Sequence, residues 1–191
     1  SIMRRCLENK ERAFVPTSIA MSFYVLRAMS SAGGNVYNDH FHHFWKPWRE
    51  QLSLGLTTWE EDSVSQRSDC HAWGSAPIYE FMAEVAGIRP AEQGWNAITF
   101  QPRVELYDNF EARVPLKMVN DEVSGVANVS WSTTPSRNMV VSLTVNLKDD
   151  RLILIHVHLP QGPVRLMRSD DEMTFVVRRG AEPSFNTPKL C

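Results

Sequence analysis

The chain has 191 residues, of which 43% are hydrophobic and 22% are charged, a balance that is typical of folded globular protein and excludes global disorder. Twenty Lys and Arg against 22 Asp and Glu give a formal net charge of -2. A nearly neutral chain carries no basic field that would gather nucleic acid or anionic lipid, so neither class of partner is predicted.

Membrane insertion and a disulfide framework are also not predicted. Arg27 interrupts the best apolar run, SIAMSFYVLRAM, well before the roughly 20 residues that cross a bilayer. Cys6, Cys70 and Cys191 are odd in number and far apart, which does not fit a set of paired disulfides. The opening SIMRRCLENKERAF lacks the apolar core of a signal peptide and does not begin with Met. We therefore expect the back part of a longer protein, and the compartment stays open.

Apolar spacing in the first half of the chain is helical. Thr17 or Ser18 is expected to cap a first helix that Gly33 ends. Asn38 is expected to cap a second helix, which Pro47 should kink because proline removes a backbone donor. The apolar stripe predicted for this second helix has steps of three and four: Phe41, Phe44, Trp45, Trp48 and Leu52.

A third helix is predicted from about Ser75, with Pro77 in its first turn, to Gly87. Its predicted core-facing residues are Ile78, Phe81, Met82 and Val85. The three stripes together hold more apolar surface than three helices bury among themselves. We therefore expect further helices, absent from this chain, to cover them.

The apolar period changes to two after Trp95. In LILIHVHL, for example, Ile155 is expected to face the core while His156 and His158 face outward. The strand-like runs are AITFQ, FEARVPL, GVANVSW, MVVSLTVNL, LILIHVHL and MTFVV. Helices followed by strands predict two domains, a helical one over 1–96 and an antiparallel β-sandwich over 97–191.

The long connection between the second and third helices is the main functional candidate. It reads GLTTWEEDSVSQRSDCHAWG, so Trp59 and Trp73 bracket Glu60, Glu61 and His71, together with further carboxylates. A carboxylate beside an indole is partly desolvated, which raises its pKa and suits it to proton transfer near neutral pH. Paired carboxylates are the usual equipment of glycoside hydrolysis, and aromatic faces hold sugar rings. The plain alternative is a solvated surface loop.

Three runs together resemble the α-L-rhamnosidases of glycoside hydrolase family 78. They are TSIAMSFYVLRAMSSAG, then FWKPWREQLSLGLTTWEE, then RSDCHAWGSAPIYEFMAEVAGIRPAEQGWNAITFQPRV. The resemblance covers roughly residues 14 to 131, and its ordered set Thr-Thr-x-x-Glu, Ser-x-x-His and Gly-Ile-x-Pro is specific where each element alone is weak. It implies the end of a six-hairpin α-barrel followed by a C-terminal β-sandwich, and hydrolysis of terminal α-L-rhamnose with inversion.

The resemblance also implies roles for residues of the connection. The final Glu of Thr-Thr-x-x-Glu is the family's general base and falls on Glu61, with Glu60 as the fallback because Trp59 sits one place earlier than the family's usual aromatic. The His of Ser-x-x-His bonds the sugar and falls on His71. Three more residues are expected in the site by position only: Trp59, Trp73 and Asp69. No cofactor or metal is implied.

The family's general acid lies in an upstream acidic segment that residues 1 to 50 do not resemble. An inverting site needs a second carboxyl about 6.5 to 9.5 Å from the base. Asp62, Asp69 and Glu50 satisfy no family pattern for it. The chain is therefore expected to be inactive by itself, with the missing N-terminal part of the barrel and a rhamnose-containing glycoside as its partners.

Two other functions stay open. One is a non-catalytic carbohydrate-binding or scaffold protein derived from such an enzyme, although several of the aromatic residues that the sandwich offers are expected in the core: Tyr107, Phe110, Trp131, Phe175 and Phe185. The other is a helical metal site at His40 and His43, which share a helix face but have no third ligand in the sequence. Neither has a motif as specific as the family resemblance.

Overall fold

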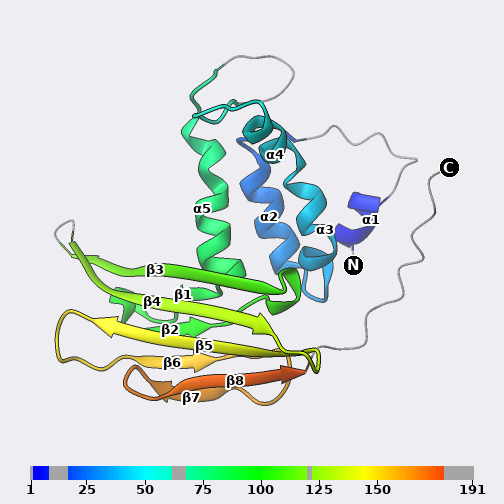
Figure 1. Cartoon of the computed structure of the whole chain (residues 1–191). Helices are drawn as coiled ribbons and strands as arrows, with labels where there is room; N and C mark the ends of the chain where they lie inside the picture. Colours follow the sequence, from blue (N-terminus) through cyan, green and yellow to red (C-terminus); the bar gives the residue numbers. More distant parts are fainter. Residues whose placement is uncertain (1, 9–16, 62–67, 120–121, 179–191) are drawn as a thin grey trace. The chain divides into compact units, whose positions relative to one another are not determined.

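The computed structural model describes residues 2–8, 17–61, 68–119 and 122–178, and the chain forms two compact units (Figure 1). The units divide between Glu80 and Phe81, so each is described separately. This division lies earlier in the chain than the predicted domain boundary at 96/97. The reason is that β1 (Ile88–Pro90), which falls in the predicted helical part, pairs with β2 (Ala97–Phe100).

The first unit is helical. Its elements are α1 (Ile2–Glu8), α2 (Ser22–Ser31), α3 (Val36–Phe44), α4 (Lys46–Ser53), the 3₁₀ turn η1 (Ala72–Ser75) and α5 (Ala76–Glu80). Its core contains apolar residues that are each at most 5% exposed, among them the predicted Phe41, Trp45 and Trp48: Leu26, Met29, Val36, Tyr37, Phe41, Trp45 and Trp48. No helix in the described part of the chain is long and apolar enough to cross a membrane.

The predicted starts of the first two helices need correction. Ser18 accepts a hydrogen bond at Oγ from the Met21 N–H (3.3 Å), as a capping residue does, but regular helix begins only at Ser22. Asn38 is not a cap, because α3 already begins at Val36 after Asn35. The predicted kink is confirmed as a break, since Trp45 leaves the helical conformation and Pro47 occupies the first turn of α4.

Two predicted core positions are wrong, and a polar neighbour is buried in place of each. Leu52 is 61% exposed while Gln51 is 1% exposed, and Ile78 is 60% exposed while Glu80 is fully buried. The break at Trp45 explains the first, because it resets the helical phase of the residues that follow. In both places the polar residue is buried with a hydrogen-bond partner, whereas the predicted apolar residue faces solvent.

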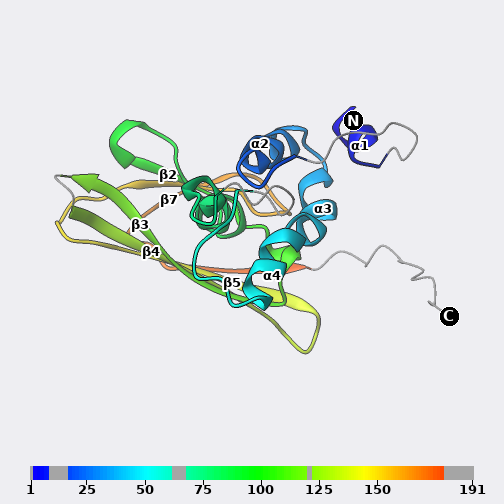
Figure 2. The same ribbon diagram turned by 90° about the horizontal axis from the view of Figure 1, so that it is seen from above.

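The second unit is a two-sheet β-structure that begins with a π-helical turn, η2 (Phe81–Val85). One sheet has the order β1-β2-β6-β7, with β6 (Leu154–Val157) and β7 (Arg165–Arg168). The other has the order β3-β4-β5-β8, formed by β3 (Asn109–Val119), β4 (Glu122–Thr133), β5 (Asn138–Leu147) and β8 (Met173–Arg178). Figure 2 shows them as two layers, as expected for a β-sandwich.

Strand pairing is antiparallel except between β2 and β6, which are parallel. The sequence predicted an antiparallel sandwich, and this pair corrects it. After β2 the chain passes through β3, β4 and β5 before it returns as β6, and so long a connection permits parallel pairing. The predicted alternation is confirmed, since Ile155 is fully buried and its neighbour His156 is not.

Candidate functional site

Backbone hydrogen bonds fold the long connection back on itself and bring the two predicted halves of the site together. The His71 N–H donates to the Trp59 carbonyl (2.7 Å), and the Glu61 N–H donates to the Ser68 carbonyl (2.9 Å). The Thr58 hydroxyl donates to the carbonyl of Asp69. The segments 57–61 and 68–71 are thus paired, and the predicted base segment lies beside the predicted sugar-binding histidine.

The paired segment is attached to α4 through a buried amide. Gln51 accepts the Glu60 N–H at its Oε1 (3.0 Å), and its backbone carbonyl accepts the Leu56 N–H (3.1 Å). The amide therefore holds the chain at Glu60, the first residue of the pair Glu60–Glu61. The sequence analysis missed Gln51, although its spacing of three from Trp48 places it on the predicted stripe.

A close approach at Gly74 fixes Trp59. A β-carbon at Gly74 would overlap the Cβ of Trp59, so only glycine fits there. The Gly74 carbonyl accepts the Trp48 indole N–H (2.7 Å), and its own N–H donates to His71 (2.9 Å). Residues of α4, of the paired segments and of η1 therefore meet at one backbone position.

The predicted site residues differ in exposure. Trp59, Glu60, Glu61 and His71 are half-buried, whereas Asp69 is exposed. Asp62 lies outside the described residues. Half-burial suits groups that must bind a ligand from solvent while part of their hydration is removed.

Trp73 is 59% exposed and borders a cavity of about 380 Å³. Its ring lies 6.2 Å from the His71 ring, centroid to centroid, in an edge-to-face arrangement. The other residues that line the cavity come from the start of α2 and from the η1–α5 turn: Ala20, Phe23, Tyr24, Ala72, Ser75 and Ala76. The cavity is uncharged and has aromatic walls, and Trp73 connects it to His71.

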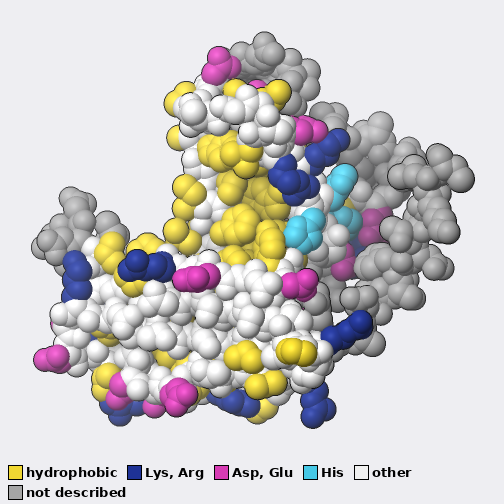
Figure 3. All heavy atoms as spheres, in the orientation of Figure 1, with side chains coloured by type: hydrophobic (Ala, Val, Ile, Leu, Met, Phe, Trp, Pro, Cys, Tyr) yellow, Lys and Arg dark blue, Asp and Glu magenta, His cyan; other side chains and the backbone are white. Residues whose placement is uncertain are grey.

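Hydrophobic side chains are exposed over α2 and α5 on the face that Figure 3 presents. The exposed fractions are 56% for Tyr24, 60% for Ile78 and 45% for Tyr79. An exposed apolar face of this kind marks an interaction surface.

Two buried carboxylates outside the connection were not predicted. Glu80 in α5 is held by Arg27 of α2 through Nη2 at 2.5 Å from each carboxylate oxygen, and it accepts the Tyr37 hydroxyl of α3 at 2.6 Å. In the other unit, Glu84 pairs with Arg103 (2.5 Å) and Arg89 (3.1 Å). Arg27 is 53 residues from Glu80 and Arg103 is 19 residues from Glu84, so no local pattern could have indicated these two pairs.

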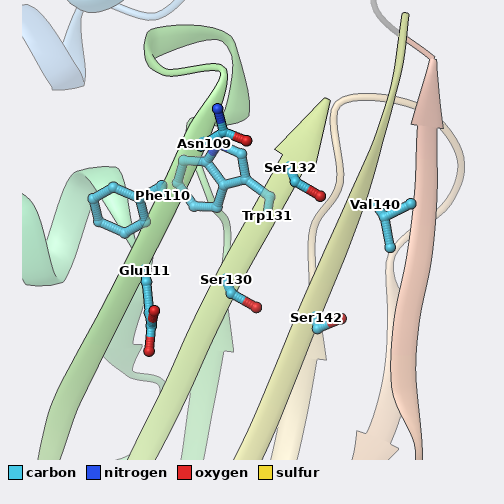
Figure 4. Close-up of a pocket in the computed structure, with 8 residues that line it drawn as sticks. All are labelled: Asn109, Phe110, Glu111, Ser130, Trp131, Ser132, Val140 and Ser142. Carbon is cyan, nitrogen blue, oxygen red and sulfur yellow. The ribbon is translucent and has the colours of Figure 1, made fainter. Parts of the chain in front are cut away.

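The β-unit has a shallow cavity of about 470 Å³ on the β3-β4-β5-β8 sheet (Figure 4). It is lined by Asn109, Phe110, Glu111, Ser130, Trp131, Ser132, Val140 and Ser142. Trp131 is 3% exposed, stacks on Phe110 at 4.4 Å between ring centroids, and donates its indole N–H to the Tyr107 carbonyl (2.8 Å). Trp131 and Phe175 are buried, as expected for several aromatic residues of the sandwich, and neither offers an exposed aromatic platform.

The histidine and cysteine candidates form no site in the described part of the chain. No group of three or more His, Cys, Asp or Glu side chains gathers there as metal ligands would. His40 lies 3.5 Å from Glu8 through Nε2, and His43 is exposed. Cys6 and Cys70 are free and exposed, while Cys191 is outside the described residues.

No protein-family model matches the sequence, and no curated protein matches it either. Solved structures share the fold. The GH78 family rhamnosidase of Bacillus sp. GL1 is 24% identical, with a TM-score of 0.63 over 84% of this chain and 17% of that one. An α-L-rhamnosidase from Aspergillus terreus is 15% identical, with a TM-score of 0.60 over 92% of this chain and 21% of that one.

A third solved α-L-rhamnosidase, from Dictyoglumus thermophilum, is 21% identical, with a TM-score of 0.51 over 73% of this chain and 16% of that one. The resemblance to the family 78 α-L-rhamnosidases is therefore confirmed at the level of the fold. The part of each enzyme that matches is about a fifth of its length or less.

Proposed function

We propose that this chain carries the general-base segment of an inverting α-L-rhamnosidase. The observation that carries the proposal is the pairing of segments 57–61 and 68–71, which puts the Glu60–Glu61 pair next to His71 within a fold shared with solved α-L-rhamnosidases. A terminal α-L-rhamnoside is the substrate. His71 and the indoles of Trp59 and Trp73 bind the sugar, with Asp69 at the exposed edge.

Glu61 rather than Glu60 is the base in this proposal. The Glu61 N–H and the Trp59 carbonyl point to the segment 68–71, whereas the Glu60 N–H points to Gln51. Backbone groups that alternate in this way belong to an extended segment, in which residues two apart share a side. Glu61 therefore shares the side of Trp59, and Glu60 faces the other way.

The chemistry of Glu61 is that of a base acting on water. In an inverting hydrolysis its carboxylate takes a proton from water as the oxygen attacks the anomeric carbon, and a carboxylic acid on the other side protonates the leaving oxygen. We propose that this acid comes from another part of the full-length protein. Each matched enzyme is about five to six times longer than its aligned part, which supports that proposal.

In this proposal, helices from another part of the full-length protein pack on the exposed apolar face over α2 and α5. Tyr24, Ile78 and Tyr79 would then be buried by neighbouring hairpins of a six-hairpin barrel. The β-unit, in which Trp131 and Phe175 are buried, serves in this proposal as a packing domain rather than as a polysaccharide-binding one. In this proposal the helical unit forms the last part of the barrel, and other residues of the full-length protein form the rest of the barrel.

The test is kinetic, on the full-length protein that contains this chain, with 4-nitrophenyl α-L-rhamnoside as substrate. Glu61→Gln removes the base but keeps the side-chain shape, and we expect kcat to fall roughly 10²- to 10⁴-fold. Glu60→Gln is the matched control and should change kcat little. The reverse result would assign the base to Glu60, and normal turnover in both variants would refute the proposal.

A second candidate is carbohydrate binding without hydrolysis, which the aromatic cavity beside Trp73 favours. Isothermal titration of the chain with rhamnose and with an aryl rhamnoside tests it. Binding that Trp73→Ala abolishes, in a full-length protein that releases no rhamnose, would replace catalysis by binding as the function.

A further inference from the structure

Gln51 is a buried polar residue in a helix whose neighbouring side chains face solvent. It is 1% exposed, whereas Glu50 and Leu52 on either side are exposed. A primary amide loses its water on burial, and that loss is compensated only where hydrogen bonds replace it. The hydrogen-bond partners of Gln51 therefore indicate which part of the chain it positions.

Both bonds made by Gln51 to the following connection go to backbone N–H groups. Its side-chain Oε1 accepts the Glu60 N–H (3.0 Å), and its main-chain oxygen accepts the Leu56 N–H (3.1 Å). Gln51 thus holds the segment 56–60 at both of its ends, through the Leu56 N–H and the Glu60 N–H. No other side chain in the described part of the chain accepts a hydrogen bond from the Glu60 N–H.

The other end of the amide has no partner within the described residues. Gln51 Nε2 is buried and makes no hydrogen bond there. An apolar residue such as Leu would fill the same space without an unpaired donor, so core packing alone does not account for glutamine at this position. The bond from Oε1 to the Glu60 N–H is the feature that an apolar side chain could not supply.

We infer that Gln51 is a positioning residue for the proposed base. This inference rests on the proposed function of Glu61. By fixing the Glu60 N–H on the α4 side, Gln51 sets the alternation that turns Glu61 toward the side of Trp59. Gln51 does not touch substrate; it acts through the backbone of its neighbour in the site.

The experiment compares Gln51→Met with Tyr37→Phe in the full-length protein. Methionine keeps the length of the side chain and removes the acceptor. Tyr37→Phe likewise removes one buried hydrogen bond, from the Tyr37 hydroxyl to Glu80, but it leaves the Arg27–Glu80 ion pair and the bond from Gln51 to the Glu60 N–H in place. Hydrolysis of 4-nitrophenyl α-L-rhamnoside gives kcat and KM, and thermal unfolding gives the stability of each variant.

We expect Gln51→Met to lower kcat about 10- to 100-fold, because a carboxylate that is displaced by about 1 Å loses alignment with its water. KM should stay within about twofold of the parent value, as for a residue that acts only on the transition state. Tyr37→Phe should keep kcat at a comparable melting temperature. That combination would separate positioning from a general loss of stability.

Two results would overturn the inference. If Gln51→Met and Tyr37→Phe change kcat equally, Gln51 is a structural residue only, while the proposed function stands. If the parent protein neither hydrolyses nor binds a rhamnoside, the proposed function fails and the inference fails with it.

Discussion

Replacing Glu80 by Gln should destabilise the helical unit severely. The carboxylate is fully buried, and it accepts bonds from Arg27 Nε (3.1 Å), from Arg27 Nη2 (2.5 Å to each oxygen) and from the Tyr37 hydroxyl (2.6 Å). The amide keeps the shape but removes the charge, so the Arg27 guanidinium, whose side chain is only 25% exposed, loses its counter-ion. Removing one member of a buried pair costs about 3 to 5 kcal/mol, and we take about 3 kcal/mol because Arg27 keeps some solvent.

The assay is urea unfolding of the 191-residue chain followed by tryptophan fluorescence, to which Trp45, Trp48, Trp59 and Trp73 of the helical unit contribute. Glu50→Gln is the matched control, because that Glu is 56% exposed and lies 3.5 Å from Lys46 on the surface. It should change stability by no more than about 0.5 kcal/mol. The double variant Arg27→Met with Glu80→Leu removes both charges and should recover most of the loss.

An equal and small effect of Glu80→Gln and Glu50→Gln would refute this reasoning. So would a double variant as unstable as the single one, because the loss would then come from packing and not from an unpaired charge.

Two more predictions concern the connection and the sandwich. Gly74→Ala should force Trp59 to move, because the new methyl group overlaps the Trp59 Cβ. We expect the free energy of unfolding to fall by about 1 to 3 kcal/mol and the near-ultraviolet circular dichroism to change. An unchanged spectrum and stability would contradict the close approach. Ile155→Ala should cost about 2 to 5 kcal/mol in urea unfolding because the side chain is fully buried, whereas His156→Ala on the other face should cost no more than about 0.5 kcal/mol; equal costs would contradict the assigned faces.

The sequence predicted the sandwich strands better than the helices, and the reason is physical. In β5 the buried residues Met139, Val141, Leu143 and Val145 are all apolar and follow a period of two without interruption. In the helical unit, the break at Trp45 shifts the phase of the helical period, so a fixed step of three or four pointed to Leu52, which is exposed. In α5 the buried residue is Glu80, which has Arg27 as its partner, and not the apolar Ile78.

The candidate site was predictable in part. The residues Trp59, Glu60, Glu61 and His71 follow from local motifs, and the structure pairs the segments that carry them. What holds those segments was not predictable, because it depends on partners distant in sequence. Gln51 looks like a surface residue until Glu60 is folded back onto it, and Glu80 looks like one until Arg27 is brought beside it.

These buried polar groups also explain how the described parts of the connection, 55–61 and 68–74, are held in place. Its first end leaves α4, where Gln51 binds the Glu60 N–H, and its second end enters α5, where Glu80 joins Arg27 of α2 and Tyr37 of α3. Between the two ends, Gly74 allows Trp59 to lie against η1, and Trp48 of α4 donates to the Gly74 carbonyl. Hydrogen bonds are directional whereas apolar contacts are not, so this set fixes the position of Glu61 more closely than an apolar anchor would. Loss of the Arg27–Glu80 ion pair should therefore lower kcat in the full-length protein at temperatures where the chain is still folded, whereas Tyr37→Phe, which keeps that ion pair, should not.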